Sequence, residues 1–324
     1  MNDTYFVTGA LGCIGAWVVK QLVERGDRPV VFDVGGDPRR IRDVLGEQGL
    51  AKVQFVAGDI TDLDATKRAV AACKPRAIVH LAGLQVPFCR QDPALGARVN
   101  VLGTIHVFEA ALAAGVGRIA YASSAAVFGP SEDDGVAVTE HTATAPVTHY
   151  GVYKQANEGT ARIYWLEKQL SSVGLRPLTV YGVGRDQGMT AGPTTAMKAA
   201  VLGRPYKIAF SGPTDFVHVG DTAAAFLQCA DGGPAGAHVF NLHGDTVDVA
   251  AVVLAIEEEC PAARGTLSIA GPRIPIPSHL DDGAIRAHYP KLPHTPLRDG
   301  VRTTIARFRE LHAQGALDAR DVKP

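Results

Sequence analysis

The sequence feature that most constrains the fold is a glycine-rich turn between an apolar segment and a helical one. The segment Tyr5 to Thr8 is short, apolar and rich in aromatic and β-branched residues, as buried strands are. The segment Cys13 to Arg25 carries apolar residues at helical spacing, and Gly26 lies where that helix would end. The glycines of this turn are Gly9 and Gly12 between the two segments and Gly15 at the start of the second. A strand that runs directly into a helix begins a βαβ unit, so the next strand is expected to pair in parallel.

The same alternation continues through the first half of the chain. A further helix is predicted from Asp92, a good N-cap, through Pro93 at the first helical position to about Ala114. Strands that alternate with helices predict an α/β fold, a Rossmann-type doubly wound parallel sheet with helices on both faces. The other short apolar runs that we interpret as buried strands are Pro29–Phe32, Gln54–Val56, Ala77–Leu81 and Arg118–Ala122.

The rhythm changes after a sixth predicted strand at Leu175–Val180, because residues 182–216 are rich in Gly, Pro and Thr. We therefore expect an NAD-binding Rossmann domain over residues 1–181 and a smaller substrate lobe over residues 182–324, partly threaded back into the first domain. The later elements expected are a helix from Asp221, a strand at His238–Leu242, and helices at Asp248–Glu259 and Leu297–Ala313.

Composition excludes several classes of function. Lys and Arg number 32 against 33 Asp and Glu, so no basic surface for nucleic acid or an anionic membrane is indicated. The longest apolar run, Val249 to Ile256, is far shorter than the roughly 18 residues of a membrane span. Five cysteines without a Cys-x-x-Cys pair and histidines without metal-ligand spacing indicate neither a disulfide framework nor a metal site. We expect a cytoplasmic, globular protein.

The glycine turn predicts a dinucleotide site. Glycines let the backbone turn tightly and approach a pyrophosphate, whose charge the helix N-terminus stabilises. Asp33 closes the second predicted strand, where a carboxylate accepts hydrogen bonds from ribose hydroxyls and repels a 2′-phosphate. NAD is therefore the expected cofactor. Arg39 and Arg40 lie close enough in sequence to raise NADP as an alternative, although we interpret them as solvated loop residues.

A second group of residues predicts acid–base chemistry. Ser124 follows the fifth strand, at the sheet edge where ligands bind in open α/β folds. Tyr150 and Lys154 are four residues apart and share a helix face, so the ammonium and an oxidised nicotinamide would lower the pKa of the phenol. Tyr150 could then remove a hydroxyl proton while hydride leaves the carbon, and Ser124 would orient the same substrate oxygen.

The Tyr-x-x-x-Lys spacing occurs twice, so the choice needs an argument. Tyr164 and Lys168 form the second match, but the apolar residues around Tyr164 indicate packing. Tyr153 is adjacent in sequence to Lys154 and cannot share its helix face. Tyr150 is the predicted base because it lies where a loop enters the helix.

Taken in order, these residues resemble the extended short-chain dehydrogenase/reductase superfamily, in its NAD-dependent sugar epimerase/dehydratase group. The resemblance extends over nearly the whole chain. The motifs that carry it are Gly9-x-x-Gly12-x-x-Gly15, Asp33, Gly58-Asp59-Ile60, His80-Leu81-Ala82-Gly83, Asn100-Val101-x-Gly103-Thr104, Ser123-Ser124, Tyr150-x-x-x-Lys154, the segment Leu175 to Gly182, and Asp215-Phe216-Val217-His218-Val219.

The resemblance implies roles for individual residues. The catalytic residues would be Ser124, Tyr150 and Lys154, and a homodimer would form through the Asp92–Ala114 and Tyr150–Gln169 helices. The substrate would contact Gln85, Ser124 and Arg185. The implied NAD contacts are Gly9, Gly12, Cys13, Ile14, Gly15, Asp33, Asp59, Ile60, Leu81, Ala82, Gly83, Asn100, Tyr150, Lys154 and Leu178.

Three departures from the family pattern narrow the expected activity. Ala125 to Val127 replaces the acid–base pair of the dehydratases. Thr214 occupies the position where nucleotide-sugar epimerases often have a diphosphate-binding arginine. Gln85 occupies the position where epimerases often have a lysine. We therefore expect net oxidation of a secondary alcohol on a sugar or sugar-derived substrate. A (nucleotide-)sugar epimerase that retains NAD is the alternative, and a non-catalytic dinucleotide sensor is a second one.

Overall fold

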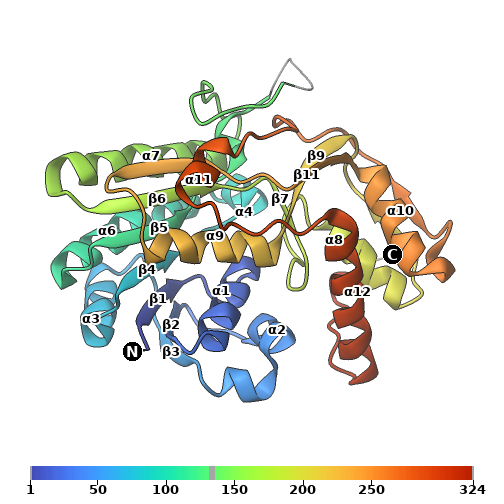
Figure 1. Ribbon diagram of the computed structural model, residues 1–324, viewed down its shortest axis with the longest axis horizontal. Helices are drawn as coiled ribbons and strands as arrows, with labels where there is room; N and C mark the ends of the chain where they lie inside the picture. Colours follow the sequence, from blue (N-terminus) through green and yellow to red (C-terminus); the bar gives the residue numbers. More distant parts are fainter. Residues whose placement is uncertain (1, 131–135, 323–324) are drawn as a thin grey trace.

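The centre of the molecule is a seven-stranded parallel sheet (Figure 1). A computed structural model describes residues 2–130 and 136–322. The strand order is β10-β6-β5-β4-β1-β2-β3, which confirms the predicted Rossmann-type fold. The strands are β1 (Thr4–Thr8), β2 (Arg28–Asp33), β3 (Gln54–Ala57), β4 (Ala77–His80), β5 (Arg118–Ala122), β6 (Ser171–Arg176) and β10 (Ala237–Asn241).

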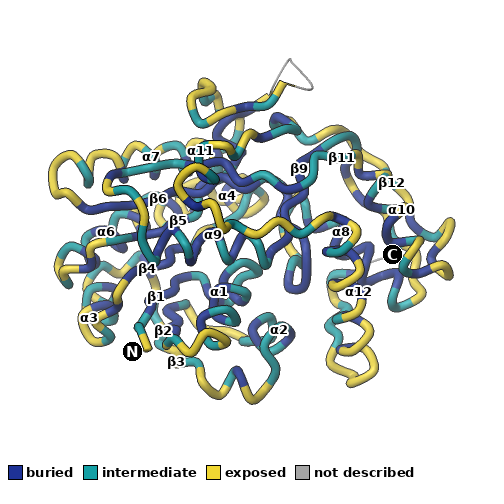
Figure 2. Tube along the Cα trace, in the orientation of Figure 1, coloured by how far each residue is buried: buried dark blue, intermediate teal, exposed yellow. Residues whose placement is uncertain are grey.

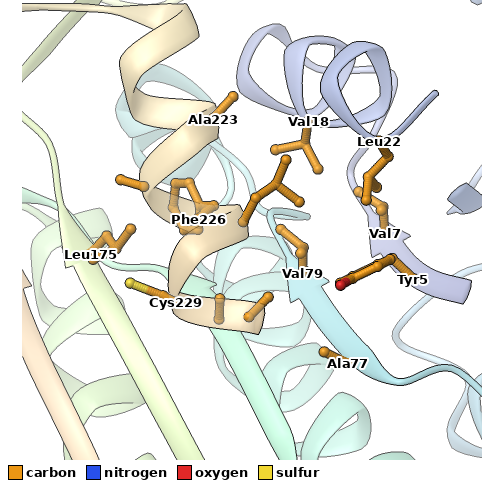
Figure 3. Close-up of a cluster of buried hydrophobic side chains, with 14 of the residues drawn as sticks. Tyr5, Val7, Val18, Leu22, Ala77, Val79, Leu175, Ala223, Phe226 and Cys229 are labelled. Carbon is orange, nitrogen blue, oxygen red and sulfur yellow. The ribbon is translucent and has the colours of Figure 1, made fainter. Parts of the chain in front are cut away.

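Helices cover both faces of this sheet, each over its own hydrophobic core. On one face lie α1 (Cys13–Glu24), α2 (Arg39–Leu50) and α9 (Val219–Asp231). Figure 3 shows part of this core, in which Val18 of α1 and Phe226 of α9 belong to one cluster with Val7 and Val79 of the strands. The other face carries α3 (Leu63–Cys73), α6 (Gly103–Ala114) and α7 (His149–Lys168). The inner strands are almost continuously buried, whereas edge strand β3 is largely exposed (Figure 2).

Two predicted elements have different boundaries in the structure. The sixth strand was expected at Leu175–Val180, but the chain forms β6 and a separate β7 (Thr179–Tyr181), which pairs in another sheet. Pro177 lies at the break and has no N–H for a ladder. The helix from Asp92 is capped as predicted, since Asp92 Oδ1 accepts a hydrogen bond of 2.8 Å from the Leu95 N–H. It is divided into α5 (Pro93–Ala97), a π-helical turn η1 (Arg98–Leu102) and α6.

Residues beyond β7 build a second, smaller core. A three-stranded sheet joins β7, β9 (Pro213–His218) and β11 (Asp245–Asp248), and a two-stranded sheet joins β8 (Tyr206–Ile208) and β12 (Leu267–Ile269). Around them pack α8 (Gly192–Val201), α10 (Val249–Glu259) and α12 (Leu297–Ala313). The remaining short elements are α4 (Val86–Gln91), η2 (Ala125–Val127), η3 (Pro261–Ala263) and α11 (Gly283–His288).

The later half of the chain also returns to the first sheet. Strand β10 completes its edge beside β6, and α9 packs against α1 over one face. The division of the chain at residue 181 into a Rossmann domain and a partly threaded substrate lobe stays a prediction.

Candidate active site

The glycine turn forms a tight cradle at the end of β1. Gly9 has a φ of +68°, and a Cβ there would lie 2.4 Å from the Ala82 nitrogen. A Cβ on Gly15 would lie 2.5 Å from the Ala10 Cα, and one on Gly12 would lie 3.1 Å from the Gly9 oxygen. Any side chain at Gly9 or Gly15 would fill this cradle. The turn leads into Cys13 and Ile14 at the first turn of α1, so the free N–H groups of the helix face the cradle.

Cys13 is a packing residue of this turn. Its Sγ lies 4.0 Å from the Val183 carbonyl oxygen. Burial raises the pKa of its thiol to about 12, so the group stays protonated and unreactive at neutral pH.

Asp33 lies beside the cradle at the end of β2. Its Oδ2 accepts a hydrogen bond of 3.2 Å from the Leu11 N–H, and its Oδ1 accepts one of 2.9 Å from the Val34 N–H. Burial raises the pKa of Asp33, although these N–H groups and the charge of Arg40 act in the opposite direction. The carboxylate is thus fixed against the glycine turn with further acceptor capacity.

Arg39 and Arg40 differ from their prediction as solvated loop residues. Both lie on α2 and are largely buried, and both donate to the carboxylate of Asp186 in the segment after β7. Their hydrogen bonds lower the pKa of Asp186, even though burial acts to raise it. The error arose because the partner lies 146 and 147 positions away in the sequence.

Asp59 and Ile60 follow β3 at the outer part of the same sheet edge. Asp59 is exposed, and its Oδ1 accepts a hydrogen bond of 2.8 Å from the Thr61 N–H. Ile60 is buried against Gly103, and its carbonyl accepts from His106 Nδ1 at 2.8 Å. Asp59 does not cap the following helix, since Asp62 does so by accepting from the Ala65 N–H.

The segment after β4 is held to β1 through a buried histidine. His80 Nδ1 lies 2.7 Å from Thr8 Oγ1, and His80 Nε2 lies 2.9 Å from Thr104 Oγ1. Burial lowers the pKa of His80 to about 3, so the ring is neutral and bridges the two hydroxyls. The Leu81 N–H donates to the Thr8 carbonyl and the Ala82 N–H to Thr8 Oγ1. This pairing places Leu81 and Ala82 against the glycine cradle.

Asn100 supports the next part of that segment. It is fully buried in η1, and its side chain accepts from the Leu84 N–H at 2.8 Å and donates to the Leu84 carbonyl at 3.0 Å. A Cβ on Gly83 would lie 2.7 Å from Asn100 Oδ1 and 3.5 Å from Lys154 Nζ. Asn100 therefore fixes the backbone around Gly83, and its amide has little capacity left for a ligand.

Helix α7 brings the predicted acid–base residues to the end of β5. Thr148 caps the helix by accepting from the Gly151 N–H at 3.0 Å. A Cβ on Gly151 would lie 2.5 Å from the Ala126 carbonyl oxygen, so only glycine permits this approach of α7 to η2. The close approach brings the side chain of Tyr150 near that of Ser124, which acts to lower the pKa of the phenol. Ser124 Oγ also accepts from the Ala126 N–H at 3.2 Å.

Lys154 lies beneath Tyr150 and is 4% exposed. Its Nζ donates a hydrogen bond of 2.7 Å to the Ala122 carbonyl at the end of β5, and lies 5.5 Å from the centre of the Tyr150 ring. Burial lowers the pKa of Lys154 to about 8, while the charge of Glu158 acts to raise it. The structure thus brings the three predicted catalytic residues together.

The expected lowering of the Tyr150 pKa is not found in the protein alone. Burial raises the pKa of the phenol, and the hydrogen bond with Ser124 and the charge of Arg185 only partly offset this effect. The prediction omitted the loss of solvation, which acts most strongly on an ionised phenol. It also left out the charge of Arg185, which was predicted only as a substrate residue and which acts to lower the pKa of Tyr150 from the segment after β7.

The two other tyrosines have structural partners. Tyr164 OH donates to Glu109 at 2.7 Å, and its ring packs 5.0 Å from that of Phe108. Tyr153 OH donates to the Pro93 carbonyl at 2.8 Å. Packing was the correct interpretation for Tyr164.

The predicted substrate residues Gln85 and Arg185 lie close together. A Cβ on Gly188 would lie 2.1 Å from Gln85 Oε1 and 3.3 Å from Arg185 Nη2. Gln85 Oε1 and Arg185 Nε are buried without a hydrogen-bond partner, and the bond that the structure records for the guanidinium is that of Nη2 with Thr190 Oγ1, at 2.9 Å. Buried polar atoms of this kind are usually satisfied, so the pair is suited to a ligand. Leu178 lies between β6 and β7 and packs on the apolar cluster around Ala125.

Sequence reasoning missed a buried ion pair behind the site. Glu158 accepts from Arg176 Nε at 2.7 Å and from Arg176 Nη2 at 2.6 Å, and it also accepts from Ser123 Oγ. The pair joins α7 to the ends of β5 and β6. The sequence did contain a signal for Glu158. Tyr150, Lys154 and Glu158 are spaced four residues apart, so they lie on one helix face.

Two other kinds of site find no support in residues 2–130 and 136–322. No three side chains of His, Cys, Asp or Glu are grouped so that they could hold a metal ion. No helix in these ranges combines the length and the apolar character needed to cross a bilayer.

Comparison with known proteins gives a consistent result. Residues 5–242 match the model of the NAD dependent epimerase/dehydratase family. A UDP-glucose 4-epimerase of Mycolicibacterium smegmatis is 34% identical over 235 residues, which cover 71% of this chain and 73% of that protein. The UDP-glucose 4-epimerase of Thermus thermophilus, solved with NAD, has a TM-score of 0.81 at 25% identity and covers 94% of this chain and 99% of that one. The protein MoeE5, solved with UDP-glucose and NAD, has a TM-score of 0.80 at 28% identity over 95% and 99% of the two chains.

The buried ammonium predicts a stability effect that can be measured without any ligand. Replacing Lys154 by Met removes a charge whose pKa in the folded protein is about 8, against an ordinary lysine value of 10.5. We expect Lys154→Met to raise the free energy of unfolding by about 1–2 kcal/mol at pH 7, after allowance for the lost bond to Ala122. Urea denaturation would measure this difference.

The pH dependence gives the control. The unfolded chain binds the Lys154 proton more tightly between pH 8 and pH 10.5, so the wild type gains stability relative to Lys154→Met as pH rises through that window. Lys168→Met, on an exposed position of the same helix, should change stability by less than about 0.5 kcal/mol at either pH. A wild-type protein that is more stable than Lys154→Met at pH 7 would contradict this account.

Proposed function

Because this chain belongs to the NAD-dependent epimerase/dehydratase family, we propose that it oxidises a secondary alcohol of a sugar or sugar-derived substrate by hydride transfer to NAD. The observation that carries the proposal is the meeting of Ser124, Tyr150 and Lys154 at the carboxyl end of the sheet. Ligands of open α/β folds bind at this edge, beside the point where the strand order reverses.

The chain's own residues fit NAD. The cradle that a Cβ on Gly9 or Gly15 would fill suits a pyrophosphate, and Asp33 suits the adenosine ribose. When bound, oxidised NAD supplies the hydride acceptor and a positive charge that favours the phenolate of Tyr150. The other residues proposed to line the cofactor are Gly12, Cys13, Ile14, Asp59, Ile60, Leu81, Ala82, Gly83, Asn100, Tyr150, Lys154 and Leu178.

Three side chains would together remove the hydroxyl proton of the substrate during the oxidation. Tyr150 Oη takes the substrate hydroxyl proton as the hydride leaves the carbon, which leaves a ketone. Ser124 Oγ, which lies near Tyr150, orients the same substrate oxygen. Lys154 is held by Ala122 under the phenol, and its charge stabilises the phenolate.

Gln85 and Arg185 are the proposed substrate-binding side chains outside this group. Gln85 Oε1 and Arg185 Nε are buried without a hydrogen-bond partner, and both side chains lie against Gly188. Arg185 is also close enough to influence the pKa of Tyr150. A substrate hydroxyl could satisfy either atom, by donating to Gln85 Oε1 or by accepting from Arg185 Nε.

Two outcomes of the oxidation remain to be separated. The relatives are UDP-glucose 4-epimerases, which favours epimerisation with NAD retained. Net dehydrogenation is favoured by Thr214, whose hydroxyl is buried and 3.0 Å from Thr179 Oγ1, so that it presents no cation to a diphosphate. We keep net dehydrogenation as the first proposal.

A substrate panel tests this choice. Purified protein would be incubated with NAD and with free aldoses, uronates, sugar acids and UDP-glucose, and absorbance of reduced nicotinamide would be followed. A dehydrogenase accumulates reduced cofactor in proportion to product, whereas an epimerase converts UDP-glucose to its 4-epimer without net absorbance change. Conversion of UDP-glucose alone would overturn the dehydrogenase proposal and support its alternative.

Removing one oxygen tests the proposed base. Tyr150→Phe should lower kcat by at least about 10²–10⁴-fold, because proton transfer is lost while the ring and its packing remain. NAD affinity, measured by calorimetry, should change less than threefold. Tyr153→Phe is the matched control and should retain activity, since Tyr153 bonds only to the Pro93 carbonyl in the structure. Full activity of Tyr150→Phe would refute the assignment, and NAD binding without turnover in the wild type would favour a sensor.

We also propose a homodimer through η1 and α7. Leu102, Ile163 and Leu166 leave 42%, 44% and 61% of their surface exposed on these elements. Apolar side chains grouped on two neighbouring helices are suited to a four-helix contact with a second copy. Sedimentation equilibrium should give twice the mass of one chain, and a monomer at micromolar concentration would refute the proposal.

A further inference from the structure

Asp186 forms ion pairs with two arginines beside the proposed cofactor site. Arg39 Nη2 lies 2.5 Å from Asp186 Oδ2, and Arg40 Nη2 lies 2.6 Å from Asp186 Oδ1. Arg40 Nε lies 3.1 Å and 3.2 Å from the two carboxylate oxygens of Asp186, so the ion pair is bidentate, the geometry of strong arginine–carboxylate pairs. The three side chains are 8–19% exposed, so water screens the contact only in part.

The pair adjoins the position proposed for the adenosine ribose. Arg40 Nη1 donates to the Leu11 carbonyl at 2.8 Å, and the Leu11 N–H donates to Asp33 at 3.2 Å. One residue of the glycine turn thus joins the guanidinium to the carboxylate that would receive the ribose hydroxyls. In sites that accept NADP, an arginine at this place binds the 2′-phosphate.

We propose that Asp186 is a specificity-determining residue that excludes NADP by holding Arg40 in an ion pair. This inference rests on the proposed dinucleotide site. Asp33 repels the 2′-phosphate directly, and Asp186 removes the cation that would otherwise attract it. Two residues more than 150 positions apart in the sequence thereby act on the same phosphate.

Arg40 is the cation that this pairing controls. Arg39 also contacts Asp43 at 3.2 Å and Asp318 at 3.1 Å, so it keeps carboxylate partners when Asp186 is changed. Among the described residues, the hydrogen-bond partners recorded for Arg40 are Asp186 and the Leu11 carbonyl. Without Asp186 it would be an unpaired guanidinium next to Asp33.

The effect of changing Asp186 on NADP affinity should depend on whether Asp33 is present. Dissociation constants for NAD and NADP would be measured by calorimetry for the wild type, Asp33→Ala, Asp186→Asn and the double variant. We expect the dissociation constant for NADP to be at least tenfold lower in the double variant than in Asp33→Ala. The dissociation constant for NAD should differ less than threefold between these two variants. Adding Arg40→Met to the double variant should abolish the NADP gain.

Controls separate this effect from general damage. Asp318→Asn removes a partner of Arg39 and of the exposed Arg320 but none of Arg40, so it should leave the ratio of the two constants unchanged in the Asp33→Ala background. If Asp186→Asn fails to fold, as judged by circular dichroism, Arg40→Met in the Asp33→Ala background still decides the point. With Asp186 present, this change should leave the NADP constant unchanged, and weaker NADP binding would overturn the proposal.

Two results distinguish the possible failures. A folded double variant with the same NADP constant as Asp33→Ala overturns the role of Asp186 while the proposed function stands. A wild-type protein that binds neither dinucleotide overturns the proposed function and this inference with it.

Discussion

The hydrogen bond from Lys154 to the Ala122 carbonyl fixes the ammonium of α7 against the end of β5, in a position that water scarcely reaches. This contact joins α7 to the strand that Ser124 follows. Gly151 leaves the room for the close approach of α7 to η2. The phenol of Tyr150 then lies within reach of Ser124, which follows the same strand. The burial that holds Lys154 in place also lowers its pKa, because a charged ammonium loses its solvation there. The position of the ammonium in the site is therefore maintained at a cost to the stability of the fold.

Local patterns in the sequence predict much of this arrangement. The strands of the first half, the glycine turn, the cap at Asp92 and the last helix follow from periodicity and turn chemistry within short windows. The pairing of Ser124 with Tyr150 and Lys154 followed from helix spacing and from the rule that ligands lie at the carboxyl edge of a parallel sheet. These inferences need only residues close together in the sequence and the general rules of the α/β fold.

The features that could not be predicted depend on contacts between distant segments. The environment of Arg40 is set by Asp186, and no short window of sequence contains both residues. The pKa of Tyr150 depends on burial, which is a property of the whole fold, and on Arg185 from beyond β7. The split of the sixth strand was signalled by Pro177, but the separate pairing of Thr179–Tyr181 with β9 required the tertiary structure.

The return of the chain to its first sheet has a consequence for synthesis. Until Ala237–Asn241 leaves the ribosome, β6 is an unpaired edge, and the apolar residues that α9 covers are open to solvent. About three quarters of the protein must therefore be made before this sheet can close, and the long sequence separation of β6 and β10 slows their meeting. We expect nascent chains that stop near residue 181 to aggregate or to require a chaperone, because a ready-made template for strand addition would remain uncovered.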